Sequence, residues 1–569
     1  MSPSPAPDRL LRVAAPWCIG TISACTCAVV IWACTSSGTS GPKPRKSDQG
    51  SRPGAPATPP TRPRSTSLPA VDPCLTAVAN GKATRVDRMG KPLAAKPRDQ
   101  VPRFWFATAT RGLTGRFVDD AEIWYLAHPG GACMEVFVDG RLRGRVSTRT
   151  LPRRPKGTPP RARPRPKTTG LRRVARLDLE ATDTGRRRLA RTATGRFFEA
   201  RRIRLKRGHH RVELRPVGRG TLRLFGVVMR RNRPGVVVHT LGVPGAQVAN
   251  VSPGHKALIR AQLKRLRPDL LVLMLGTNDA FDRGLTAKRL ERRLTKLLKR
   301  LRGKRAKPDC LILGAPDFGS KKWRTARRLR KGAAMVRKIQ RKVAKAQGCV
   351  YWDVFSAMGG TDSIKRLIRA RPRLAFKDRV HLTRRGYRAL GSLIHDELLR
   401  HYARYLRSSH RRRPLTVPRR PPQELRQEKE DRRNWPAGMG PTPFVDPQGK
   451  GLRRFFRRLV LVHRRARRAR ASIVVLGDSH TAGDSLAGEV RYRLQRAFGD
   501  GGHGYLHVGK PWISYRHRHV RYGIAGPWKY YYILTWNKPV QPRDWLYGAG
   551  GVSSWISLPI PPKKPRAVP

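Results

Sequence analysis

Short apolar segments alternate with helical patterns over the middle of the chain, and this rhythm limits the fold more than any other feature. Four such segments follow Pro234, at 236–241, 270–275, 310–313 and 350–354. Apolar residues at helical spacing fill the intervals, at 256–265, 287–302 and 322–347. A strand without a polar side is buried on both faces. The alternation therefore predicts an α/β domain with a parallel sheet covered by helices.

A different pattern comes before this section. From about Trp105 to Val228, short runs of alternating apolar and polar residues end at Gly, Pro or Asp turns. This pattern predicts an all-β sandwich module, which we place at residues 100–232. A Pro- and Arg-rich tract at 152–168 interrupts the module, and we interpret it as a solvated loop or, secondarily, an anion-binding arm.

Polar residues stand directly beyond the ends of the apolar segments. A further apolar segment late in the chain, 473–476, is followed by Gly477-Asp478-Ser479-His480. The earlier section contributes three strings: Gly242-Val243-Pro244-Gly245, Gly276-Thr277-Asn278-Asp279, and Asp378 to Thr383, which includes His381. Parallel sheets carry active sites beyond the carboxyl ends of their strands. Each string alone is an ordinary turn or cap, but together they supply a nucleophile, a base with a carboxylate, and oxyanion donors.

These strings resemble the four blocks of the SGNH (GDSL-type) hydrolase family, which has a flavodoxin-like parallel-sheet core. The resemblance covers about residues 236–402 and 450–500, and its motif residues include Gly477, Asp478 and Gly276. It implies that Ser479 is the nucleophile, His381 the general base and Asp378 the residue that orients the base. The implied oxyanion donors are the Ser479 amide, the Gly245 amide and the Asn278 side chain. The chemistry needs no cofactor and no metal.

The order of the blocks departs from that of the family, in which the serine block comes first. Without segment 473–476 the earlier section lacks a nucleophile and a central strand, and without the earlier section the later one lacks a base. We interpret residues 233–405 and 441–569 as one circularly permuted or split domain, joined by a linker at 406–440. The alternative is a degenerate tandem, which predicts an inactive protein or two chains that exchange halves.

The β-module points to a class of substrate. In family order the tail ending at Gly550-Gly551-Val552 leads into the module, which then becomes an insertion between the first and second blocks. This layout is similar to that of peptidoglycan O-acetylesterases with a carbohydrate-binding-like β-module. It implies removal of acetyl esters from peptidoglycan or another envelope polysaccharide. Candidate sugar-groove residues, each equally compatible with ordinary packing, are Tyr515, Arg516, His517, Arg518 and Trp528.

The N-terminus predicts export. Two arginines precede an apolar stretch from Val13 to Ala33, and a Pro- and Ser-rich stretch at 35–73, which we interpret as a disordered linker, follows it. Residues 1–34 are therefore a signal peptide or an anchor, with lipidation at Cys34 and an uncleaved transmembrane segment both open. Both alternatives place the folded part outside the cytoplasm, in the periplasm or the cell envelope.

The cysteines predict no zinc site, because none of those outside the N-terminal segment has metal-ligand spacing. Cys310 and Cys349 stand at the starts of two predicted strands, so a disulfide is feasible if those strands are neighbours.

The charge is extreme, with 122 Lys and Arg against 36 Asp and Glu and a net charge of +86. The basic residues are spread over predicted helices and linkers, which favours attraction to an anionic envelope surface over specific nucleic-acid recognition. Two alternative functions remain: a non-catalytic, polycationic envelope-binding protein with a rearranged fold, and a lipid esterase, whose long apolar lid is not evident. The oligomeric state is left open.

Overall fold

The computed structural model describes residues 101–108, 118–150, 196–206, 208–251, 256–303, 307–409, 415–418, 421–534 and 546–558, all within the unit Ala70–Pro569. The expectations for residues 1–34 with Cys34, for 35–73 and for the tract at 152–168 concern residues outside these ranges. Among the described helices, none combines the length and the apolar composition needed to cross a lipid bilayer.

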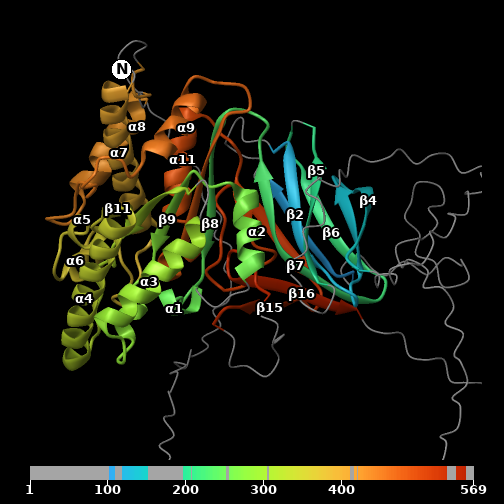
Figure 1. Ribbon diagram of the computed structural model, residues 1–569, viewed down its shortest axis with the longest axis horizontal. Coiled ribbons are helices and arrows are strands. Elements are labelled where there is room, and N and C mark those ends of the chain that lie inside the picture. The colour runs from blue at the N-terminus through green and yellow to red at the C-terminus, as the bar shows by residue number, and fades with distance from the viewer. Residues whose placement is uncertain are drawn as a thin grey trace, which may run out of the picture. The chain divides into compact units, whose positions relative to one another are not determined.

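A five-stranded parallel sheet forms the centre of the α/β part (Figure 1). Its spatial order is β11 (Val350–Trp352), β10 (Asp309–Leu313), β9 (Leu270–Met274), β12 (Arg470–Gly477) and β8 (Gly235–Gly242). The predicted α/β fold with a parallel sheet is therefore confirmed. β12, the late segment, pairs in parallel with β8 on one side and with β9 on the other. The two separated stretches of sequence thus share one sheet, with the late strand in its interior.

Alternate side chains of β12 enter two different apolar cores. Val474 and Leu476 face a core shared with three helices, and Ile473 and Val475 face a second core shared with three others. The first three helices are α2 (Lys256–Leu266), α3 (Ala287–Arg302) and α4 (Trp323–Gln347); the others are α7 (Arg384–Ser409), α9 (Arg453–His463) and α11 (Leu486–Phe498). Successive side chains of a strand point to opposite faces, so burial on both sides explains the continuous apolar sequence.

Short helices complete the α/β part. They are α1 (Val248–Val251), the 3-10 helix η2 (Asp279–Phe281), α5 (Val354–Ala357), α6 (Ser363–Arg369), α8 (Pro422–Arg433) and α10 (Ser479–Ala482). α8 lies inside the segment 406–440 that we predicted to be a linker. Its polar composition is that of a linker, but ion pairs attach it to the domain: Glu428 pairs with Arg493 of α11 at 2.8 Å, and Arg432 pairs with Asp396 of α7.

Two antiparallel sheets form the β-module. One has the order β14 (Val520–Ala525), β1 (Arg103–Thr108), β6 (Arg211–Val217), β3 (Cys133–Val138) and β4 (Arg141–Ser147). The other has the order β15 (Lys529–Tyr532), β16 (Val552–Leu558), β7 (Gly220–Arg230), β2 (Asp120–Ala127) and β5 (Phe197–Arg204), and β13 (Gly504–Leu506) also pairs with β7.

The aromatic tail belongs to this module, which corrects our assignment of all of 441–569 to the α/β core. β14 pairs with β1, and β16 pairs with β7 over the register Ser554↔Leu224 to Leu558↔Gly220. Figure 1 shows the red strands of the tail beside the blue and green strands of the module. Period-two alternation in the tail is hidden by its many aromatic residues, so its strands were not evident from the sequence.

The β-module and the α/β part share buried contacts. Trp124 of β2 and Tyr505 of β13 belong to the same apolar core as the residues of α2. Glu122 of β2 is buried and pairs with Arg230 at 3.2 Å and with Arg265 of α2. The α/β part also contains the Cys310–Cys349 disulfide. Cys310 lies in β10 and Cys349 directly precedes the neighbouring strand β11.

Candidate active site

The ends of β8, β12 and β9 lie abreast, with Gly477 in register with Gly242 on one side and Met274 on the other. The amide of Asp478 donates to the Met274 carbonyl at 3.1 Å. The two glycines are required by close packing, since a Cβ on Gly242 would lie 2.2 Å from Oγ1 of Thr481 and one on Gly477 would lie 2.4 Å from the Met274 oxygen. This packing brings the start of α10 directly onto the strand ends.

Ser479 is the first residue of α10 and is partly exposed. Asp478 caps the helix, because its Oδ1 accepts from the amide of His480 at 3.0 Å. The hydroxyl oxygen of Ser479 lies 2.9 Å from Nε2 of His381. The late segment and the earlier section therefore meet at hydrogen-bond distance within one chain.

The loop that carries His381 also holds its carboxylate partner. Oδ2 of Asp378 lies 2.7 Å from Nδ1 of His381, and Oδ1 accepts from the amides of Val380 at 2.9 Å and His381 at 3.0 Å. Partial burial alone would raise the pKa of Asp378, but these hydrogen bonds hold it below its ordinary value. An ionised carboxylate accepts only, so Nδ1 carries the proton and the Nε2 lone pair faces Ser479.

Two other loops adjoin this pair. Gly245 adopts a φ of 76°, in the left-handed region, and the side-chain amide of Asn278 donates to the Ala246 carbonyl at 3.2 Å. The carboxylate of Asp279 accepts from the amide of Val248 at 3.1 Å, which clamps the two loops together. Among the described residues, neither the Ser479 amide nor the Gly245 amide has an acceptor. Both are available to donate to a ligand.

His480 was not assigned a role from the sequence, although it follows the serine directly. It is buried, and its Nδ1 lies 3.0 Å from the hydroxyl of Tyr387 on α7. Its ring centroid lies 5.7 Å from that of His381. Burial lowers the pKa of His480 to about 3, so the ring is neutral behind the base.

The predicted sugar-groove residues are mostly buried, which corrects that prediction. Tyr515 and Trp528 belong to the apolar core of the β-module, and His517 is 6% exposed. The hydroxyl of Tyr515 accepts from the His507 amide at 2.8 Å, so it supports the module from within. Of the five residues, only Arg516 is fully exposed, and Arg518 is half-buried. Aromatic and histidine side chains occur both in buried cores and in sugar-binding grooves, so the sequence could not distinguish these two locations.

A buried ion pair fixes this tail segment to the start of α11. Asp484 accepts from Arg491 at 2.9 and 2.7 Å, from the hydroxyl of Thr240 at 2.9 Å and from the amide of Arg518 at 2.8 Å. Burial would raise the pKa of Asp484, but Arg491 and the other donors hold it well below its usual range. The adjoining Trp512 donates to the Ala482 carbonyl at 3.3 Å, so the β-module reaches the helix that carries Ser479.

Asp478 makes stability depend on pH. Burial raises the pKa of its carboxyl to about 7 against the opposing hydrogen bond from His480, and the charge of Asp279 adds to the rise. The folded state thus binds the Asp478 proton more tightly than the unfolded chain does. The stability contributed by this bound proton is lost as pH rises from about 4 to about 7. We expect the free energy of unfolding to fall by up to about 1.4 kcal/mol per pH unit over this window.

Asp478→Asn tests this expectation, because the amide still caps α10 but cannot ionise. Urea unfolding across the same pH window should give a flatter slope for Asp478→Asn than for the parent. Asp431→Asn, which removes an exposed carboxylate on α8, is the matched control and should keep the parent slope. Equal slopes in all three proteins would refute the assignment.

No group of three or more His, Cys, Asp or Glu side chains within the described ranges is arranged to hold a metal ion.

Comparison with known proteins gives a family match over part of the chain. Residues 217–389 match the GDSL-like Lipase/Acylhydrolase family. The match includes Gly245, Asn278, Asp378 and His381, and it ends before Ser479. No curated protein matches the chain.

Several solved structures are similar in part. One is titled a peptidoglycan O-acetylesterase in action, with 18% identity, a TM-score of 0.29 and coverage of 53% of this chain and 76% of its own. A family two carbohydrate esterase from Clostridium thermocellum has 9% identity, a TM-score of 0.16 and coverage of 45% and 83%. A salicylyl-acyltransferase from a tetracycline biosynthetic pathway has 16% identity, a TM-score of 0.16 and coverage of 46% and 72%. TM-scores this low leave the activity of the present chain to be judged from its own residues.

Proposed function

We propose that the protein is an exported serine esterase that removes O-acetyl groups from a cell-wall or other envelope polysaccharide. The match of residues 217–389 to the GDSL-like Lipase/Acylhydrolase family supports the esterase part of this proposal. The observation that carries the esterase proposal is the continuous chain from the Asp378 carboxylate through His381 to the Ser479 hydroxyl, with distances of 2.7 and 2.9 Å. This is the geometry of an activated serine nucleophile.

The proposed reaction has two halves. His381 Nε2 takes the hydroxyl proton as Ser479 Oγ attacks the ester carbonyl, and the amides of Ser479 and Gly245 with the Asn278 side chain stabilise the oxyanion. The sugar alcohol leaves with the proton from His381, and acetyl-Ser479 remains. Water then gives a proton to His381 and attacks the acetyl group, and acetate leaves as the proton returns to Ser479. The Asn278 side-chain amide has two N–H groups, so one keeps its bond to the Ala246 carbonyl while the other donates to the oxyanion.

The proposed substrate class is an acetylated envelope polysaccharide. It is supported by the layout of the chain, in which strands from the tail complete a β-module that is packed against the catalytic part. It is also supported by the apolar N-terminal stretch, which favours export to a compartment that contains envelope polysaccharides.

The test is acetate release by purified residues 70–569 from O-acetylated peptidoglycan and from acetylated xylan, with a long-chain p-nitrophenyl ester for comparison. We expect acetate from at least one acetylated glycan and little hydrolysis of the long-chain ester, because the sequence shows no evident long apolar lid. Ser479→Ala is the control for background hydrolysis. Preference for the long-chain ester would favour the lipid esterase, and no hydrolysis of any acetyl ester would favour the non-catalytic alternative.

A further inference from the structure

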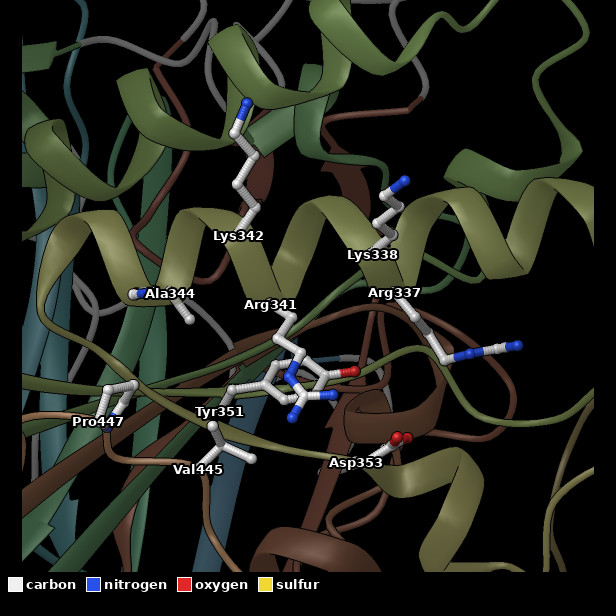
Figure 2. Close-up of a pocket in the computed structure, with 10 residues that line it drawn as sticks. Arg337, Lys338, Arg341, Lys342, Ala344, Tyr351, Asp353, Val445 and Pro447 are labelled. Carbon is white, nitrogen blue, oxygen red and sulfur yellow. The ribbon is translucent and has the colours of Figure 1, made fainter.

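A cleft of about 570 Å³ lies beside the second half of α4, away from the residues of the candidate active site (Figure 2). Its floor includes Tyr351 of the edge strand β11 and Asp353, and its far wall is the segment at 445–447. None of its lining residues takes part in the Ser479 and His381 site. A volume of this size accommodates a small ligand or one unit of a polymer.

The cleft is strongly cationic. Five of its lining residues are basic and come from α4: Arg337, Lys338, Arg341, Lys342 and Lys345. Asp353 is the one carboxylate among the lining residues, and its oxygens also accept from the amide and hydroxyl of Ser356. Figure 2 shows Arg341 extending from α4 to the ring of Tyr351 and Arg337 leaving the same side of the helix, whereas Lys338 and Lys342 leave the other side.

Most of these charges are not neutralised by the protein. Lys342 pairs with Glu291 at 2.9 Å, but Lys338, Arg341 and Lys345 form no ion pair with any described residue. α4 contains no acidic residue, so positive charges four residues apart repel each other along its length. The helix therefore has an excess of positive charge beside the cleft, and a bound anion would reduce the repulsion between these charges.

The surroundings of two groups in the cleft favour a bound anion. The Arg337 guanidinium stacks at 3.9 Å on the ring of Phe355, and burial lowers the pKa of Arg337, so pairing with an anion is favoured. Burial likewise raises the pKa of Tyr351, so its hydroxyl remains protonated and able to donate. Guanidinium groups match the oxygens of phosphate in paired hydrogen bonds, and lysine adds point charge.

We propose that this cleft binds a phosphate group of an anionic polymer, with Arg337, Arg341 and the Tyr351 hydroxyl as donors. A polymer is favoured over a single anion because Arg337, Arg341 and Lys345 recur once per helical turn, about 6 Å apart along the axis. Such a site would hold the protein on a phosphate-bearing polymer while the serine site remains open. The proposal is independent of the esterase activity.

The test measures binding of long-chain inorganic polyphosphate to the purified protein at fixed ionic strength. The double variant Arg337→Gln/Arg341→Gln is expected to bind on the order of tenfold more weakly than the parent. The control Arg324→Gln/Lys331→Gln removes the same charge from exposed positions on the same helix outside the cleft and is expected to change affinity less than about threefold. Equal losses in the two double variants would overturn the proposal, because a chain of net charge +86 attracts any polyanion.

A second pair of variants tests the sign of the effect. Asp353→Asn retains a cap for α5 but removes the negative charge that faces the ligand, so it should tighten polyphosphate binding. Glu430→Gln, on exposed α8, removes the same charge elsewhere and should have little effect. Tighter polyphosphate binding by Glu430→Gln but not by Asp353→Asn would contradict the proposal. The proposal would also be contradicted if polyglutamate or phosphatidylglycerol vesicles bound as tightly as polyphosphate and lost as much affinity in Arg337→Gln/Arg341→Gln. All variants should hydrolyse a small acetyl ester like the parent.

Discussion

Ser479→Ala should lower kcat/KM for a small acetyl ester at least about a thousandfold. The reason is that the Ser479 hydroxyl is the proposed nucleophile, held 2.9 Å from the ring nitrogen of His381. Steady-state hydrolysis of a chromogenic acetate by purified residues 70–569 provides the measurement. His381→Ala should have an effect of similar size, since the serine is not activated without its base.

The double variant Ser479→Ala/His381→Ala shows whether the two residues act together in one site or contribute independently to activity. Residues that act as one unit are strongly non-additive, so the double variant should be no slower than the slower single variant. Thermal unfolding should be nearly unchanged in Ser479→Ala, because the side chain is partly exposed and its one described hydrogen bond is to His381. A folded Ser479→Ala protein that keeps a tenth of the parent activity would exclude Ser479 as the nucleophile.

A chain that ends at residue 409 should lose both its fold and its activity. It would lack β12, which lies between β8 and β9, and those two strands would be left with unpaired backbone groups at the centre of the sheet. It would also expose both apolar cores that β12 completes. Circular dichroism and urea unfolding should show no cooperative transition. A folded, active fragment would show that the first section needs neither Ser479 nor the late strand.

Supplying the missing part separately should restore the domain. Co-expression of residues 70–409 with residues 421–569 is expected to give a complex with acetyl-ester activity, because the contacts between the segments are those of a continuous sheet. Val474→Asp in the second segment is the control: Val474 is fully buried, and an unpaired carboxylate there is too costly to tolerate. Failure of the unmodified segments to associate, with each one folded alone, would contradict a single domain.

The parallel sheet could be predicted because it depends on simple burial. A strand such as β12, with Ile473 and Val475 on one face and Val474 and Leu476 on the other, must be apolar throughout, and only a sheet covered on both sides satisfies that pattern. Strand-end residues could be located for the same reason, since they follow those segments directly. Their grouping in space required the resemblance to a family, because the nucleophile and the base are far apart in sequence.

The features that the sequence left hidden depend on tertiary contacts. Polar α8 is held by ion pairs with Asp396 and Arg493, which no local pattern reveals. Tyr515 and His517 have the composition of a sugar groove, but Tyr515 belongs to the apolar core of the β-module and His517 is buried beside Asp484. The cleft beside α4 was likewise hidden, because basic residues also occur on the other long helices and the facing segment at 445–447 is distant in sequence.

The most direct test of the composite site is labelling of Ser479 by a serine-reactive fluorophosphonate, followed by peptide mass spectrometry. The intact protein and the co-expressed segments should be labelled at Ser479, whereas residues 421–569 alone should not react, because His381 lies on the other segment. Equal labelling of residues 421–569 alone, or an unlabelled intact protein, would contradict a single site built from the two segments.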